Sequence, residues 1–238
     1  MRLSSSMSGM WKRGMVWIVR HRQTKEPVTD RPNLNHRATS RLYLSPESLD
    51  QIFRTARTPN AWSDSPVEEV LVHELYDLLK WGPTASNTCP ARFVWVRSSE
   101  GKAKLASLAM PPNRPKILSA PLTVIIGNDL GFSESLPKLL APERVPVVLG
   151  ILEANEGMTE SMAMRNGSLQ GAYLILAARA LGLDCWPMSG FDNAAVDQAF
   201  FAGTKIQSNF LCGLGYAHAD AVRPRGPRLT FEEAGHFV

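Results

Sequence analysis

The chain has 238 residues, of which 44% are hydrophobic and 20% are charged. These values are close to the average for globular domains, and 17 glycines and 17 prolines are too few for a collagen-like or low-complexity chain. The formal net charge is +4, but nine Lys and Arg against two Asp and Glu lie in residues 1–44, so the remainder is mildly acidic. A nucleic-acid partner would need a basic stripe on the folded body, so we expect none.

Residues 1–44 show no sustained hydrophobic periodicity. The apolar run 15–19 is too short for a secretory signal. We interpret residues 1–44 as a basic, disordered leader, or as an upstream stretch that a later start codon omits. An Arg-rich transit peptide is the alternative.

The three cysteines, Cys89, Cys185 and Cys212, are far apart in the sequence. No Cys-x-x-Cys pair or Cys/His cluster is present, so the sequence predicts neither a metal site nor a disulfide framework. Buried thiols of this kind are typical of a reducing compartment, and we expect a cytoplasmic protein. No apolar run approaches the length of a membrane span, so no membrane association is expected.

The first predicted helix begins after residue 44, where a folded domain over 45–238 is expected to start. Ser45 followed by Pro46 is typical of an N-cap with proline in the first helical position. Apolar residues then recur at helical spacing. Pro59 ends this helix, because the residue before a proline avoids the α conformation.

A second helix is predicted over 65–80. It opens on the capping box Ser65-Pro66-Val67-Glu68 and ends at Gly82-Pro83. The later elements are predicted from β-branched composition or helical periodicity. In chain order they are a strand at 93–97, a helix at 100–109, a strand at 122–127, a long helix at 161–181, a strand at 184–186, a helix at 194–200 and a strand at 209–215.

Residues 129–157 are rich in proline and read as irregular, and one interpretation is a mobile lid over a site. The alternation of helices with a few strands predicts an α+β fold.

Several catalytic signatures are excluded. His73-Glu74 begins like a zinc-protease helix, but position 77 is Asp. No Walker loop and no Gly-x-Ser-x-Gly elbow is present.

Three polar clusters remain as candidate sites. Arginines suit a phosphate, because the planar guanidinium donates bidentate hydrogen bonds. The loop 82–90 offers amides and hydroxyls that could bind the edge of a planar heterocycle, and the turn 187–191 follows a strand end. Each cluster could instead be an ordinary surface feature. The arginines are Arg54, Arg57, Arg223, Arg225 and Arg228.

Together these segments resemble the nitroreductase family of FMN-dependent oxidoreductases. The likeness is greatest to the branch that reduces malonic semialdehyde in pyrimidine degradation. It runs in order from about Ser45 to Ala234. The matching segments are 56–62, 79–84, 87, 90–92, 165–166, 170–175, 179–184, 187–192, 199–203 and 227–234.

The resemblance implies an α+β fold with a mixed sheet flanked by helices, in an intertwined homodimer with FMN at the subunit interface. Arg57 and Thr58 would hold the FMN phosphate and ribityl chain, and Arg228, with Arg225 as a weaker candidate, would reach the phosphate. Where much of the family has a second basic residue, this chain has Asn60, which makes the pair Arg57 and Arg228 more important. Two further sets would line the flavin: Pro83, Thr84, Ala85 and Asn87 from the partner subunit, and Pro187, Met188, Ser189 and Gly190 along the ring.

The implied activity is hydride transfer from NADPH or NADH through FMN to an acceptor, with no conspicuous acid–base side chain. The acceptor implied is malonic semialdehyde, reduced to 3-hydroxypropanoate, and Arg92 or Arg165 could bind its carboxylate. A broad nitroarene or quinone reductase of the same family is an alternative. A non-enzymatic binding module with a basic N-terminal tail is a further alternative.

Overall fold

An antiparallel sheet with the strand order β1-β2-β4-β3 forms the centre of the fold. The computed structural model describes residues 43–218, 220–222 and 224–238. The expected leader lies outside the described residues, apart from Tyr43 and Leu44. The strands are β1 (Ala91–Val96), β2 (Leu122–Asp129), β3 (Asp184–Met188) and β4 (Ile206–Gly215).

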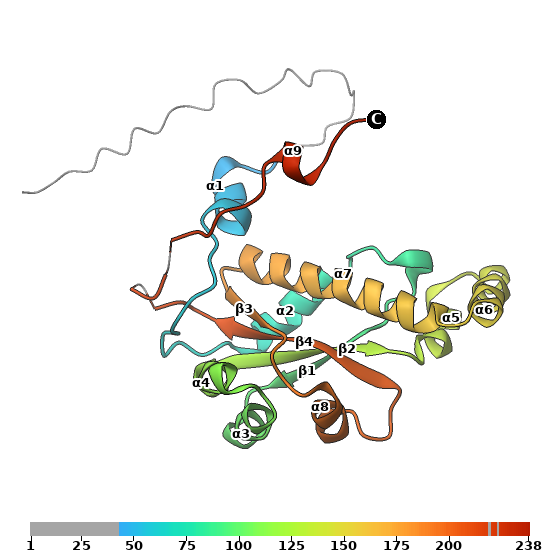
Figure 1. Cartoon of the computed structure of the whole chain (residues 1–238), viewed down its shortest axis with the longest axis horizontal. Coiled ribbons are helices and arrows are strands. Elements are labelled where there is room, and N and C mark those ends of the chain that lie inside the picture. The colour runs from blue at the N-terminus through green and yellow to red at the C-terminus, as the bar shows by residue number, and fades with distance from the viewer. Residues whose placement is uncertain (1–42, 219, 223) are drawn as a thin grey trace, which may run out of the picture. The chain divides into compact units, whose positions relative to one another are not determined.

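Helices cover both faces of this sheet, which confirms the α+β class (Figure 1). Every strand pair in the described residues is antiparallel, so one chain taken alone does not contain the parallel pairing of a mixed sheet. The α-helices are α1 (Pro46–Leu49), α2 (Glu69–Leu79), α3 (Ser99–Ser107), α4 (Arg114–Ser119), α5 (Leu136–Leu139), α6 (Val145–Ala154), α7 (Met158–Ala180), α8 (Asn193–Phe200) and α9 (Phe231–Ala234). A π-helical turn, Asp50–Arg54, continues α1.

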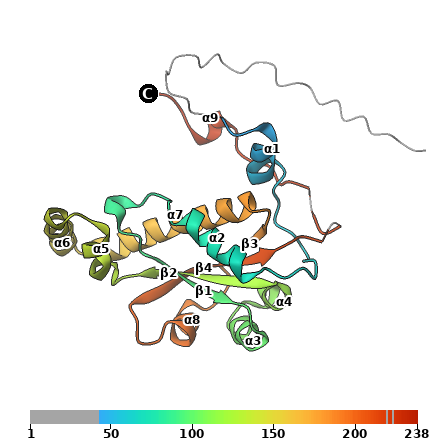
Figure 2. The ribbon, with the colours of Figure 1, turned by 180° about the vertical axis from the view of Figure 1, so that it is seen from behind.

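Two hydrophobic clusters lie on opposite faces of the sheet. On one face, α2 and α7 pack over β2, β3 and β4, with Leu75 and Leu174 fully buried. On the other face, α3, α4 and α8 cover a cluster that contains Ile117 and Leu211. Figure 2 shows both helical layers from behind. No described helix has the length and apolar character needed to cross a membrane.

The long helix α7 lies unusually close to the sheet, because glycines face the strands. A Cβ at Gly171 would lie 2.5 Å from the ring of Phe210 on β4. A Cβ at Gly167 would lie 2.0 Å from Oδ1 of Asn128 on β2. Only residues without side chains allow this approach, and it brings the polar groups of α7 within reach of the strands and their loops.

Two sequence predictions need correction. The helix expected from Ser65 begins at Glu69, because Val67 is 4% exposed and packs into the core from an extended segment. The segment 129–157 is not irregular: 3-10 turns and the helices α5 and α6 occupy much of it. In each of these helices a proline stands in the first turn, where its missing N–H breaks no helical hydrogen bond.

Candidate functional site

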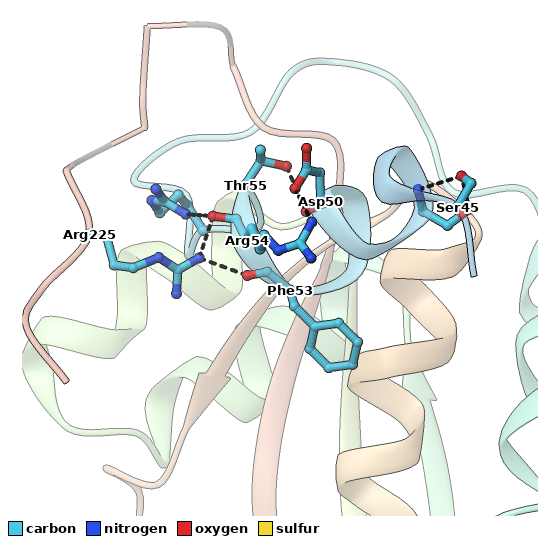
Figure 3. Close-up of polar contacts among 8 residues, drawn as sticks. Ser45, Asp50, Phe53, Arg54, Thr55 and Arg225 are labelled. Carbon is cyan, nitrogen blue, oxygen red and sulfur yellow. Dashed lines mark hydrogen bonds and ion pairs between the residues drawn. The ribbon is translucent and has the colours of Figure 1, made fainter. Parts of the chain in front are cut away.

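The residues after β4 are called the C-terminal arm here. Arg225 joins this arm to the end of the first helix. Its Nη2 donates to the carbonyls of Phe53, Arg54 and Ala56, at 2.8, 2.9 and 2.9 Å. Figure 3 shows the contacts with Phe53 and Arg54. These carbonyls belong to the turn that ends the π-helical segment, where helical acceptors lack partners. Arg225 therefore fixes the backbone from which Arg57 projects.

Arg57 and Arg228 complete what we call the arginine cluster, namely Arg57, Arg225 and Arg228. Nη1 of Arg57 donates to the carbonyls of Arg54 and Ala56, at 3.0 and 2.9 Å. Nη1 of Arg228 donates to Pro227 O at 2.8 Å and to Gly226 O at 3.2 Å. These bonds leave other guanidinium N–H groups of each residue available to a ligand.

Desolvation lowers the pKa of Arg225 from its ordinary value, and the positive charges of Arg57, Arg228 and Arg179 lower it further. Arg225 is therefore close enough to each of these three charges to be repelled by it. The described ion pairs of arginine involve Arg54, Arg92 and Arg97, so the arginine cluster has no acidic partner in the described part of the chain. Uncompensated positive charge of this kind is suited to attract an anion.

Backbone pairing explains how two distant segments meet at this cluster. Pro59 and Val222 form an isolated antiparallel bridge, as do Trp62 and Ala217. The Asn60 N–H and its Nδ2 both donate to the carbonyl of Ala221, at 2.9 and 3.1 Å. The side-chain amide of Asn60 thus ties the arm to the helix end. The adjacent Thr58 is exposed.

Arg179, near the end of α7, is a fourth cation that the sequence analysis did not single out. Its Nη1 donates to Ile52 O at 3.2 Å, and its Nε is buried without a partner among the described residues. Gln51 donates to the carbonyls of Arg179 and Ala180, at 2.8 and 3.1 Å. A cavity of about 440 Å³ lies here, bordered by Thr55 among others.

The loop 82–90 adopts an unusual backbone. Ser86, Asn87 and Cys89 have φ of 49°, 50° and 43°, in the left-handed region. The Thr84 Oγ1 accepts from the Cys89 N–H at 3.2 Å, while Nδ2 of Asn87 donates to Leu139 O on α5 at 3.0 Å. Pro83, Ala85 and Asn87 are exposed and Thr84 is half-buried.

The turn after β3 presents backbone rather than side chains. Met188 is 6% exposed, and its side chain packs in the core, so only its backbone can line a ligand. Gly190 O accepts from the Met110 N–H and from Asn113 Nδ2, both at 3.0 Å. A Cβ at Gly190 would lie 2.7 Å from Asn113 Nδ2, so a larger residue here would displace the Asn113 amide. Pro187 and Ser189 are exposed.

The two arginines expected to bind a substrate carboxylate differ in their partners. Arg92 forms a 2.7 Å ion pair with Asp129 and donates to the carbonyls of Cys89 and Ala91. Its charge is therefore already compensated. Arg165 is exposed on α7.

Within one chain, the arginine cluster and the loop 82–90 are not brought together. The turn that carries Arg57 follows Ile52, whose carbonyl accepts from Arg179 near the end of α7. The loop contacts α7 at Asn166, which accepts from the Ala85 N–H and lies much earlier in this helix. At 1.5 Å per residue these two points of α7 are about 20 Å apart. The arginine cluster and the loop 82–90 thus lie at separate places on the chain.

Comparison with known sequences settles the family. The model described as the nitroreductase family matches residues 42–216, most of the chain. The chain belongs to the nitroreductase family. A protein of Caulobacter sp. (strain K31) is 54% identical to this nitroreductase-family chain over 197 residues, covering 82% of the chain and 98% of the relative. A protein of Stenotrophomonas maltophilia (strain R551-3) is 59% identical over 195 residues, with the same coverages.

Both relatives have the provisional name NADH dehydrogenase/NAD(P)H nitroreductase. Two solved structures, provisionally assigned as nitroreductases, share the fold of this family member at low identity. The one from Exiguobacterium sibiricum was solved in complex with FMN; its TM-score is 0.73 at 22% identity, covering 84% of this chain and 100% of its own. The one from Bacillus subtilis has a TM-score of 0.72 at 21% identity, covering 81% and 99%.

Proposed function

We propose that this nitroreductase-family protein is an FMN-dependent NAD(P)H oxidoreductase. The main support is the arginine cluster: Arg225 holds the turn that carries Arg57, and no arginine of the cluster forms an ion pair with an acidic side chain in the described residues. Arg57 and Arg228 would bind the FMN phosphate through charge-assisted hydrogen bonds. The names of relatives that are more than half identical, and FMN in a structural neighbour, agree with this proposal.

Arg225 has a different part in this proposal from the one expected. Its Nη2 donates to three carbonyls, so Arg225 would hold the turn from which Arg57 projects. The remaining N–H groups of Arg225 would face the anion. When bound, FMN supplies hydride transfer, which no side chain of the protein can perform. The chain itself would bind and orient the flavin and exclude water from it.

We propose a homodimer that would complete the site, because on one chain the residues of α7 next to the arginine cluster and to the loop 82–90 are about 20 Å apart along the helix. The exposed loop residues Pro83, Ala85 and Asn87, with Thr84, would then reach the flavin of the partner subunit. The turn 187–190 would contribute its backbone, with Met188 taking part through backbone atoms only. Within this assembly Thr58 would lie beside Arg57 at the ribityl chain, and Asn60 would act by tying the arm in place.

For the acceptor we propose malonic semialdehyde. An acidic aldehyde needs a cation, and Arg165 suits this role better than Arg92, whose charge Asp129 compensates. A broad nitroarene reductase is the second candidate, because the relatives' provisional names include NAD(P)H nitroreductase.

The test uses the purified full-length chain with NADPH and NADH. Bound flavin should give visible absorbance, and kcat/KM should be higher for 3-oxopropanoate than for a nitroarene. A far higher value for the nitroarene would replace the proposed acceptor. A colourless protein that takes up no FMN and oxidises no nicotinamide would contradict the enzyme assignment and favour a binding module.

A further inference from the structure

Two buried amides of α7 hold the backbone at Ala85, inside the loop 82–90, and at Ala91, the first residue of β1 after the loop. Asn166 Oδ1 accepts from the Ala85 N–H at 2.8 Å, and Gln170 Oε1 accepts from the Ala91 N–H at 2.9 Å. Asn166 is 1% exposed and Gln170 is 5% exposed. Residues four apart lie on one face of a helix, so a single face of α7 anchors the backbone at both Ala85 and Ala91.

The backbone between these two anchors is unfavourable in isolation. Ser86, Asn87 and Cys89 all adopt positive φ, a conformation that residues with a Cβ rarely take. Such a backbone persists only where surrounding contacts determine it. The loop's own hydrogen bonds, such as Thr84 Oγ1 to the Cys89 N–H, do not fix its position against the rest of the fold.

The same stretch of α7 shows why amides can reach the loop. Each amide is followed directly by a glycine that faces the sheet, Gly167 after Asn166 and Gly171 after Gln170. These glycines let the helix approach β2 and β4 closely. Nδ2 of Asn166 also donates to Met162 O at 2.8 Å, which orients its Oδ1 toward the loop.

We propose that Asn166 and Gln170 are positioning residues that hold the loop 82–90 in the conformation it presents to the flavin. This inference rests on the proposed function, since the loop is the part expected to line FMN. Neither residue needs to touch the flavin. Asn166 acts through the Ala85 N–H and Gln170 through the Ala91 N–H. Removing either side-chain acceptor leaves that N–H without its partner.

The test compares near-isosteric variants in the full-length protein. Asn166→Leu and Gln170→Met keep the side-chain size but remove the acceptor. Asn209→Leu is the matched control, because Asn209 Nδ2 joins β4 to Ser168 of α7 and to Asn128, and not to the loop. The readouts are the Kd for FMN, hydrogen exchange of residues 84–91 in flavin-free protein, and global stability to urea.

We expect N166L and Q170M to raise the Kd for FMN by about tenfold or more, as loss of a preorganised loop conformation predicts. Both should speed exchange of residues 84–91 well beyond any change in global stability. N209L should leave the Kd and this exchange close to wild type at a comparable loss of stability. If N166L does not fold, Q170M decides alone, because it tests the second anchor, the Ala91 N–H that follows the loop.

Wild-type affinity and exchange in either folded loop variant would overturn the inference, and so would equal effects in N209L. A wild-type chain that binds no FMN would contradict the proposed function instead. In that case the exchange measurement still decides whether the two amides hold the loop.

Discussion

Arg225 donates to the carbonyl of Phe53 at 2.8 Å although 172 residues separate them in the sequence. The same nitrogen also donates to two further carbonyls of the turn. One cation thus caps the end of the first helix from the opposite end of the chain. Arg225 thereby fixes the turn that carries Arg57, and neither Arg57 nor Arg228 forms an ion pair with an acidic side chain in the described residues.

Arg225→Ala should therefore loosen the turn at residues 53–57, and weaken ligand binding as a result. Without the guanidinium, the carbonyl of Phe53 loses the Arg225 donor, and the carbonyls of Arg54 and Ala56 keep only Arg57 as a side-chain donor. We expect faster hydrogen exchange around residues 53–57 in flavin-free protein, together with weaker FMN binding. Unchanged exchange there with weakened binding would make Arg225 a direct phosphate ligand and not a support for the turn.

The arginines illustrate how far the sequence reaches at this site. Their residue type and their place in the family motif led to Arg57, Arg225 and Arg228 as phosphate ligands, and this role stays a prediction. The sequence could not predict that Arg225 holds a turn through backbone carbonyls, because these carbonyls and Arg225 come together only in the fold. Arg179 was missed for the same reason: its N–H groups serve a turn more than 100 residues away.

For the fold, strong periodicity and β-branched runs located the long helix and the strands. The start of α2 was misplaced because burial of Val67 overrides a good capping signal. Asn166 and Gln170 could have been recognised as polar residues at i, i+4 on the apolar face of a helix. Their partners could not, because the loop that they hold is distant in sequence.

Close packing of α7 on the sheet gives a stability prediction. Gly171→Ala would place a methyl group 2.5 Å from the Phe210 ring, and overpacking of this kind costs about 1–3 kcal/mol. Gly150→Ala on α6 is the control, because no atom lies within 4 Å of its Cβ. There the change should raise stability by about 0.5–1 kcal/mol. Urea unfolding of both variants measures these values, and a neutral Gly171→Ala would contradict the packing described.

The cysteines should differ in reactivity toward a thiol reagent. The Cys185 thiol and burial together raise the pKa of Cys212 well above its ordinary value, so it stays protonated at mildly alkaline pH. Cys185 is also buried, whereas Cys89 is half-buried. We expect one thiol to react in the native protein and three after unfolding, which mass spectrometry can count. Rapid native modification of Cys212 would contradict its placement in the core.

The outward side of α7 leads to a prediction about assembly. Leu169 is 44% exposed, Tyr173 is 37% exposed, and Trp81 at the end of α2 is 78% exposed. A group of large exposed apolar side chains is typical of an interface. We expect Leu169→Glu to convert a dimer into a monomer with weaker FMN binding, as measured by light scattering. A wild-type chain that is monomeric with FMN bound would refute the shared site.

The most direct test of the anion site compares FMN with riboflavin, which lacks the phosphate. Each charge-assisted contact contributes about 1.5–3 kcal/mol, so the double variant R57A/R228A should raise the Kd for FMN by about a hundredfold or more. Its Kd for riboflavin should stay near wild type, and Arg54→Ala, which removes an arginine paired with Asp50, should leave both values nearly unchanged. Equal losses for FMN and riboflavin, or undiminished FMN binding by R57A/R228A, would contradict the account.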